Sequence, residues 1–351
     1  MSEEFAVIGA GPAGAAAAAA LARTGQRVTV YEALGRLAVK PCGRALPASS
    51  DIPLPIPRSS VIQEVRRAVL YVDGVKTVDV ELPGAGYIVD KEELLEEWIV
   101  SSGAELVMSS AFDPHRGQVR VGGELREVRK GLLAAGSAFY KGEKITALQA
   151  ILRPRWQQDL DGIYIYFDTR LLGYYWVFPY SDEVEVGVGG FADAMSLRGM
   201  LNGFIRSSPE LEGSEVKGVS GAPLAIGGVR VETIGSLVKV GEAAGFVLPL
   251  TGEGIRPSAI SGYEAGRALA IGEDPIQRLS RLGMKRSVDV QRSILEAVRS
   301  MPPNRRREFL IAMPPEVHEE VALGGFNVAR ITKALARRPD LLVKLLRYIT
   351  R

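Results

Sequence analysis

Residues that bind metals or form disulfides are scarce in this 351-residue chain. It has one cysteine, Cys42, and two histidines, His115 and His318, which are far apart in sequence with no cysteine close to either. A lone cysteine excludes an internal disulfide, and this spacing argues against a zinc site. Asparagine occurs three times and glutamine eight times, a depletion of thermolabile residues reported for proteins of hot environments. We expect no metal centre.

The chain also lacks a strong net charge and a long apolar run. Its 43 basic and 41 acidic residues leave a formal charge of +2, so the overall balance predicts no nucleic-acid partner. The apolar run of residues 15–22 is alanine-rich and far shorter than the roughly 20 residues of a membrane span. The first four residues, MSEE, lack the order of a signal peptide. We therefore expect a cytoplasmic protein.

The first 32 residues follow the pattern of a dinucleotide-binding unit. A short apolar run at residues 5–8 leads into the glycine turn of residues 9–14, and an alanine-rich segment then extends to Arg23. A second apolar run, residues 27–31, ends on Glu32 about 20 residues past the glycines, as such a unit requires. The order strand, glycine turn, helix, strand and acid predicts a Rossmann-like unit.

Each position of this unit has its own physical role. Gly9 allows the tight turn, Gly11 lets the backbone approach a pyrophosphate, and Gly14 lets the helix lie close to the sheet. The pyrophosphate then meets the N-terminus of the helix. Glu32 would accept hydrogen bonds from a ribose, and its negative charge disfavours a 2′-phosphate, which argues against NADP at this place.

A second glycine-rich segment lies more than two hundred residues further along the chain. An apolar run at residues 237–240 delivers Glu242 into a turn that continues to Gly252-Glu253-Gly254-Ile255. We expect a helix to begin near Gly254 and to run to Leu269, so that its N-terminal amides face a cofactor. The alternative is a mobile surface loop, but two segments suited to the two ends of one dinucleotide favour the cofactor interpretation.

Residues 173–179 have the pattern of an aromatic strand. Tyr174, Trp176 and Phe178 alternate, so a strand would place all three on one face, as an apolar wall for a flat or polyprenyl ligand. The alternative is an ordinary aromatic core strand.

The C-terminal region is helical and basic. From Pro275 apolar residues recur at helical spacing, with breaks at proline pairs, which predicts a small helical cap. The last stretch, residues 330–351, alternates basic with aliphatic side chains, as an interfacial amphipathic helix does. A solvated cationic face explains the same pattern, so peripheral contact with the inner membrane surface stays an open alternative.

Taken together, these segments resemble the geranylgeranyl reductase family of FAD-dependent oxidoreductases, relatives of the aromatic hydroxylases. Pro12 is typical of FAD-binding glycine turns, and residues 174–179 match the Tyr-x-Trp-x-Phe-Pro pattern of the family. Lys40-Pro41-Cys42-Gly43 resembles the family's cysteine cluster beside the flavin, and residues 252–255 match its second FAD motif. Glu242 departs from the pattern, because the family usually has aspartate there.

The resemblance implies the following site residues. FAD would be bound by Gly9, Gly11, Pro12, Ala13, Gly14, Glu32, Cys42, Gly43, Arg44, Gly241, Glu242, Gly252, Gly254 and Ile255. Catalytic candidates are Cys42, Tyr174 and Trp176, and the substrate would be lined by Tyr174, Trp176, Phe178 and Pro179. No metal is implied.

The implied reaction is reduction of C=C bonds in geranylgeranyl or other isoprenoid chains, such as archaeal membrane-lipid precursors, by hydride from reduced flavin. No second strand-linked glycine triplet is present to bind a nicotinamide in a domain of its own, so the electron donor stays open between NAD(P)H and a reduced carrier. One alternative is an FAD-dependent hydroxylase or halogenase, but residues 129–137 lack the Asp-Gly of hydroxylases. Another is a non-catalytic flavin-binding or isoprenoid-binding protein.

The predicted fold class is α/β, with three parts. A discontinuous Rossmann-like FAD-binding domain would comprise residues 1–65, 88–150 and 231–275, and a β-sheet substrate domain residues 66–87 and 151–230. Residues 276–351 would form the C-terminal helical cap.

Overall fold

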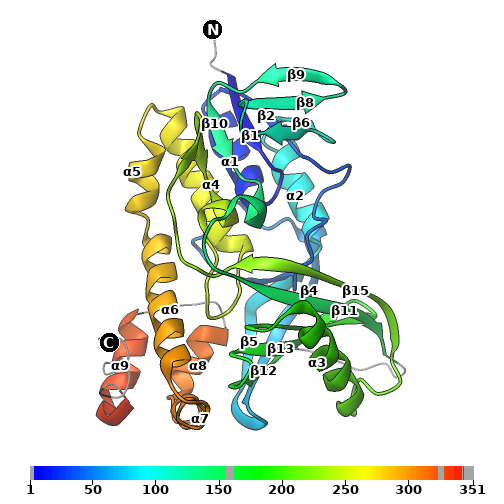
Figure 1. Cartoon of the computed structure of the whole chain (residues 1–351), viewed down its shortest axis with the longest axis vertical. Helices are drawn as coiled ribbons and strands as arrows, with labels where there is room; N and C mark the ends of the chain where they lie inside the picture. Colours follow the sequence, from blue (N-terminus) through cyan, green and yellow to red (C-terminus); the bar gives the residue numbers. More distant parts are fainter. Residues whose placement is uncertain (1–3, 155–161, 323–327, 342, 344–351) are drawn as a thin grey trace.

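The computed structural model describes residues 4–154, 162–322, 328–341 and 343, and two large sheets organise them. In Figure 1 the first sheet and helices α1 and α4 lie at one end of the molecule, and the second sheet lies at the other. Helix α6 runs along one side from the first end to the second. The predicted α/β fold is confirmed.

The first sheet has the order β16-β17-β10-β1-β2-β6. All its pairs are parallel except β16 with β17. Its central strands are therefore buried, which accounts for their almost entirely apolar sequences. The strands are β1 (Glu4–Ile8), β2 (Arg27–Tyr31), β6 (Glu105–Val107), β10 (Gly131–Leu133), β16 (Thr233–Ile234) and β17 (Leu237–Lys239).

Helices α1 (Pro12–Ala22) and α4 (Ile255–Ala270) cover this sheet and pack against each other. A Cβ atom at Gly262 would lie 2.0 Å from the carbonyl oxygen of Ala13, and one at Gly266 would lie 2.8 Å from that of Ala17. The two backbones are therefore in direct contact. This contact explains the alanine run of α1, because larger side chains would hold the helices apart.

The second sheet has the order β15-β11-β14-β13-β12-β4-β5-β3, and only the β12–β4 pair is parallel. Helix α3 (Ala194–Ser207), capped by Asp193, packs Leu197 and Leu201 against one face of it. The strands are β3 (Ala45–Pro47), β4 (Val61–Val72), β5 (Val75–Val89), β11 (Lys144–Arg153), β12 (Gly162–Asp168), β13 (Gly173–Tyr180), β14 (Glu183–Gly190) and β15 (Glu215–Ala225).

The second sheet extends past the domain boundaries expected from the sequence. Residues 61–65 and 88–89 belong to β4 and β5, and residues 144–150 belong to β11, although the sequence analysis placed all three in the cofactor domain. The boundaries there followed motifs, whereas long strands carry the chain from one domain into the other. Strand pairing across the chain is not visible in a local pattern.

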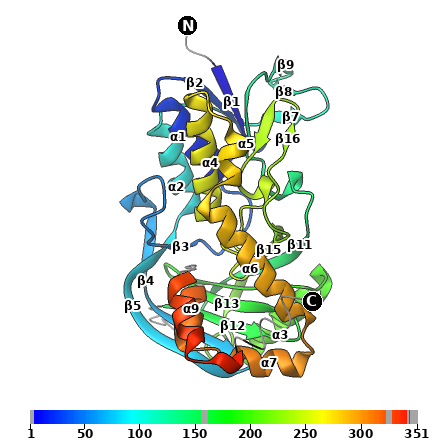
Figure 2. The ribbon, with the colours of Figure 1, turned by 90° about the vertical axis from the view of Figure 1, so that its left-hand side faces the viewer.

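Within the described residues, five helices follow α4 and form the expected cap. Figure 2 shows α6 descending obliquely toward α7, while α9 stands to the left of α6 in front of the second sheet. They are α5 (Pro275–Ser280), α6 (Gly283–Ser300), α7 (Pro303–Ile311), α8 (Pro315–Ala322) and α9 (Val328–Ala336). Part of the basic C-terminal stretch, residues 342 and 344–351, lies outside the described residues, and membrane contact stays a prediction.

A small sheet and one further helix belong to the same described part of the chain. Strands β7 (Ala111–Asp113), β8 (Gln118–Val121) and β9 (Glu124–Glu127) form an antiparallel sheet, and α2 (Lys91–Val100) is capped by the Asp90 carboxylate.

Within the described residues, no helix is long and apolar enough to cross a bilayer. The same residues contain no cluster of three or more side chains arranged to hold a metal ion.

The α1–α4 contact predicts opposite effects for two glycine-to-alanine changes. Gly262→Ala should lower the free energy of unfolding by about 1–3 kcal/mol, because its methyl group overlaps the backbone of α1. Gly199→Ala, in α3, has no described heavy atom within 4 Å of the new Cβ and should raise the free energy by about 0.5–1 kcal/mol. Urea unfolding measures both, and an unchanged midpoint for Gly262→Ala would contradict the packing argument.

Candidate active site

The glycine turn has the geometry of a phosphate-binding loop. Gly9 has φ 101°, and a Cβ at Gly14 would lie 1.9 Å from the carbonyl oxygen of Gly9. Both glycines are therefore required by the turn itself. Gly11 differs, because a Cβ there would have no heavy atom of the described residues within 4 Å. The open space at Gly11 and the N-terminus of α1 provide room for a pyrophosphate.

Glu32 reaches back from the end of β2 to this turn. Its Oε2 accepts a hydrogen bond from the amide of Ala10 at 2.9 Å, and its Oε1 accepts one from the amide of Leu34 at 3.0 Å. The carboxylate is thus fixed beside the glycine loop. Each carboxylate oxygen can accept a further hydrogen bond, so Glu32 retains the capacity to bind ribose hydroxyls.

The second glycine-rich segment, residues 241–255, which is called the second cofactor segment below, packs directly on the helix that follows the glycine turn. Gly241 has φ 59°, and a Cβ there would lie 2.5 Å from the Cβ of Ala13. The next residue, Glu242, forms an ion pair with Lys40 at 2.5 Å and accepts a hydrogen bond from the amide of Ala225 at 3.1 Å. Glu242 therefore ties together three distant segments, a role that the sequence did not predict.

The N-terminus of α4 faces a cavity. Gly254, which precedes the helix, has no side chain to cap it, so backbone amides of the first turn are available. The Arg256 guanidinium donates two hydrogen bonds to the carboxylate oxygens of Glu253, at 2.7 and 2.9 Å. It donates a third to the carboxylate of Asp51 at 2.9 Å. Burial raises the pKa of Glu253, and Arg256 opposes that rise. This network anchors the first turn of the helix.

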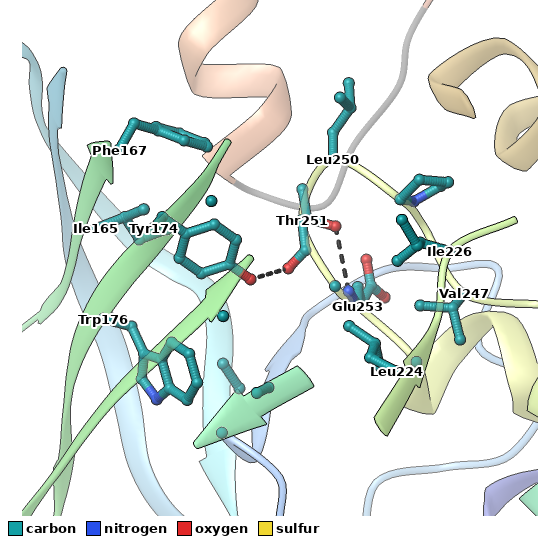
Figure 3. A pocket seen from close by; sticks show the side chains of 18 of the residues that line it. Ile165, Phe167, Tyr174, Trp176, Leu224, Ile226, Val247, Leu250, Thr251 and Glu253 are labelled. Atoms are coloured by element: carbon teal, nitrogen blue, oxygen red, sulfur yellow. Dashed lines mark hydrogen bonds between the residues drawn. The ribbon is translucent and has the colours of Figure 1, made fainter. Parts of the chain in front are cut away.

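The cavity has a volume of about 420 Å³ and a mainly apolar lining. Side chains from the second sheet, the second cofactor segment and the helical cap surround it, and Figure 3 shows its central part. Among the predicted site residues, those that line it are Pro12, Cys42, Gly43, Arg44, Tyr174, Trp176, Phe178, Glu242, Gly252, Gly254 and Ile255. Those absent from the lining are Gly9, Gly11, Ala13, Gly14, Glu32, Gly241 and Pro179.

The aromatic strand forms one wall of the cavity. Ring centroids of Tyr174 and Trp176 are 5.9 Å apart, and those of Trp176 and Phe178 are 6.4 Å apart. Pro179, which was expected to line the same cavity, is absent from its lining. Successive residues of a strand point to opposite faces, so Pro179 lies on the other face of β13.

Tyr174 joins this wall to the second cofactor segment. Its hydroxyl donates a hydrogen bond to the carbonyl oxygen of Thr251 at 2.5 Å, as the dashed line in Figure 3 shows. Burial raises the pKa of Tyr174 above its usual value of 10.0. Because its proton is held by a carbonyl and is harder to release, Tyr174 is better suited to fixing geometry than to donating a proton.

The loop that carries Cys42 lies across the cavity. Cys42 is half-buried, and its Sγ accepts a hydrogen bond from the amide of Arg44 at 3.4 Å. Lys91, at the start of α2, donates a hydrogen bond to the carbonyl oxygen of Lys40 at 2.6 Å. The Lys91 side chain therefore holds one end of the loop, and Cys42 lies in the lining of the cavity.

The helical cap supplies a wall that the sequence analysis missed. Phe309, Met313 and Ile331 line the cavity beside His318, whose Nε2 lies 2.9 Å from the carbonyl oxygen of Leu310. Burial lowers the pKa of His318, which favours the neutral ring. The apolar spacing of the cap helices was visible in the sequence, but which wall their apolar faces cover was not.

Buried Arg306 fastens this cap to the second sheet. Its guanidinium donates hydrogen bonds to the carbonyl oxygens of Val298, Arg299 and Met301 in the cap, and of Thr169 in the loop after β12. Five donors in a rigid fork suit a residue that bridges several carbonyls. The cap wall is therefore positioned by defined polar contacts.

Comparison with known proteins places these features in context. A model of the NAD(P)-binding Rossmann-like domain matches residues 7–40. Geranylgeranyl diphosphate reductase of Rhodobacter capsulatus is 27% identical over 311 residues, which cover 79% of this chain and 78% of the relative. Digeranylgeranylglycerophospholipid reductase 2 of Methanopyrus kandleri is 28% identical over 319 residues, which cover 78% of this chain and 79% of the relative.

A solved structure extends the similarity to nearly the whole chain. A Thermoplasma acidophilum protein described as geranylgeranyl bacteriochlorophyll reductase-like superposes with a TM-score of 0.81 at 20% identity, covering 99% of this chain and 100% of that protein. At this identity the superposition shows a common fold. The two sequence relatives add the family resemblance. The similarity to the geranylgeranyl reductases that the sequence motifs predicted is confirmed.

Proposed function

We propose that this protein is an FAD-dependent oxidoreductase that reduces C=C bonds of geranylgeranyl or related isoprenoid chains, such as precursors of membrane lipids. The observation that carries the proposal is the cavity, whose apolar lining begins at the Gly252–Ile255 turn and continues along the aromatic strand to the cap. An apolar chain is the ligand that such a lining favours. The names of the two sequence relatives support the same substrate class.

The chain offers a place for each end of FAD. The free space at Gly11, the N-terminus of α1 and the fixed carboxylate of Glu32 suit the adenosine and pyrophosphate end. Glu242 and the Gly252–Ile255 turn suit the ribityl and flavin end, because they line the cavity where a substrate would meet the ring. Glu242 would then exchange or share its present partner, Lys40.

The glycine turn, Glu32, Glu242 and the Gly252–Ile255 turn would hold FAD, which would supply the hydride when reduced by NAD(P)H or a reduced carrier. The first-turn amides of α4 provide positive potential for the negative charge of a reduced ring. An isolated alkene accepts a hydride poorly, so the site must stabilise positive charge that develops on carbon. The faces of Tyr174 and Trp176 offer that stabilisation, and the apolar lining excludes water.

Addition across the double bond also requires a proton. Cys42 presents its thiol at the cavity surface, whereas the Tyr174 hydroxyl is held by the Thr251 carbonyl. We therefore assign the proton to the Cys42 thiol, with Tyr174 and Trp176 shaping the cavity. The hydride and this proton together complete one saturated C–C bond.

A change at Gly11 tests the cofactor site apart from the fold. Gly11→Val should lower the flavin-to-protein absorbance ratio by about tenfold or more, equivalent to at least 1.4 kcal/mol of binding, because its side chain fills the pyrophosphate space. The thermal midpoint of the flavin-free protein should not change, since no described heavy atom lies within 4 Å of a Cβ at position 11. Gly14→Ala is the matched control and should destabilise the flavin-free protein itself. Full flavin occupancy in Gly11→Val would contradict this site.

An anaerobic single-turnover assay tests the reaction. The flavoprotein is reduced with dithionite and mixed with a geranylgeranyl lipid, and flavin reoxidation is followed together with product mass. We expect reoxidation coupled to a gain of one or more pairs of hydrogen atoms. Reduced flavin that persists until oxygen is admitted would argue instead for a monooxygenase or a carrier.

The assigned proton source predicts different results for two cavity variants. Cys42→Ser should slow flavin reoxidation by about 10²-fold or more, as expected for loss of a general acid. Tyr174→Phe should keep a comparable rate but lose about 1 kcal/mol of stability with its hydrogen bond. Rapid-mixing absorbance and urea unfolding measure the two effects. Equal rates for Cys42→Ser and the parent protein would remove Cys42 from the chemistry.

A further inference from the structure

A buried carboxyl group lies directly behind the aromatic wall. Glu185, on β14, is 2% exposed, and its Oε1 accepts a hydrogen bond from Nε1 of Trp176 at 3.2 Å. Its Oε2 lies 3.6 Å from Nε of Arg44. Glu185 is absent from the cavity lining, but both of its partners belong to that lining. It therefore contacts the cavity only through other residues.

Arg44 and Gly43 bring the cysteine loop, residues 40–44, onto this carboxyl group. The Arg44 guanidinium stacks 3.8 Å from the ring centroid of Tyr180, and the carbonyl oxygen of Arg44 accepts a hydrogen bond from the amide of Val89. A Cβ at Gly43 would lie 3.0 Å from the Phe178 ring and 3.6 Å from Glu185 Oε1. The loop thus packs directly on the strand, with Glu185 at the centre of the contact.

The neighbours of this carboxyl group offset only part of the free-energy cost of burying its ionised form. Removal from water raises the pKa of Glu185 to about 7, although Arg44, the Trp176 hydrogen bond and Lys91 lower it. These are the charged and hydrogen-bonding groups that face it, from the cysteine loop, β13 and α2 respectively. Protonated and ionised forms are therefore both populated near neutral pH. The ionised form attracts Arg44 and the indole N–H more strongly.

We propose that Glu185 is a positioning residue that clamps the cysteine loop to the aromatic strand and orients the Trp176 indole in the cavity. Ionised Glu185 holds Arg44 and the indole, and protonation loosens both contacts. The position of the Cys42 thiol relative to Trp176 then changes with pH. The importance of this change for turnover rests on the proposed function, whereas the clamp itself does not.

The clamp can be tested without any assay of activity. The whole flavoprotein is labelled with 5-fluorotryptophan, and the Trp176 signal is assigned by its loss in Trp176→Phe. We expect that ¹⁹F signal to shift between pH 5 and pH 9 with a midpoint near 7, and the shift to be absent in Glu185→Gln. Glu183→Gln, on the same strand and facing Lys217, is the matched control and should retain the shift. A Trp176 signal that does not titrate, or that titrates equally in Glu185→Gln, would overturn the proposal.

Stability provides a second readout if Glu185→Gln alters the fold. A carboxyl group whose pKa is raised on folding stabilises the protein fully below its unfolded pKa, and this contribution is lost as the pH rises through the folded value. The thermal midpoint of the parent should therefore fall more steeply than that of Glu185→Gln between pH 5 and pH 8. Parallel curves would contradict a buried, titrating Glu185.

Single-turnover assays of the variants test whether the clamp affects the proposed reaction. If the reductase function is correct, Glu185→Gln should keep its flavin and lose the pH dependence of single-turnover reoxidation near pH 7, while Glu183→Gln keeps both. An unchanged pH profile in Glu185→Gln would show that the clamp does not govern chemistry. Absence of lipid reduction in every variant, with the ¹⁹F titration intact, would remove the proposed function and leave the clamp standing.

Discussion

Backbone contact between α1 and α4 is the constraint on which the site depends. Because Gly262 and Gly266 lack side chains, α4 lies directly on the alanines of α1, and Gly241 packs on Ala13 in the same way. This contact joins two segments that are more than two hundred residues apart in sequence. The first residues of the two helices, Pro12 and Ile255, both line the cavity. Close packing of small residues therefore joins the glycine turn of residues 9–14 to the glycine-rich segment of residues 241–255.

The cavity is assembled from parts that do not share a domain. The second sheet contributes an aromatic wall, the cofactor segment contributes the turn before α4, and the cap closes the remaining side. A few polar bonds set their relative positions, among them Tyr174 with the Thr251 carbonyl, Glu242 with Lys40, and Arg306 with the Thr169 carbonyl. Each of these bonds joins two segments that are distant in sequence.

Buried acids lie at these boundaries. Glu253 is neutralised by a bidentate arginine, whereas Glu185 has one guanidinium at 3.6 Å and an indole N–H. A buried charge with few partners is costly, and burial raises the pKa of both carboxyl groups. Glu253 is held by two hydrogen bonds from one guanidinium, whereas Glu185 has no such bidentate partner. Glu253 therefore acts as a fixed anchor for α4. Glu185, beside the cysteine loop, makes a contact that responds to pH.

The sequence by itself determined the Rossmann-like unit, the helix after Gly254, the aromatic face of β13 and the helical cap, because each depends on local spacing of a few residue types. It could not determine that β11 leaves the cofactor domain at Lys144, that Pro179 points away from the cavity, or that Lys40 pairs with Glu242. It also could not reveal the partners of Glu185. Those features arise from contacts between residues distant in sequence, whose geometry and burial exist only once the sheets and the cap have packed together.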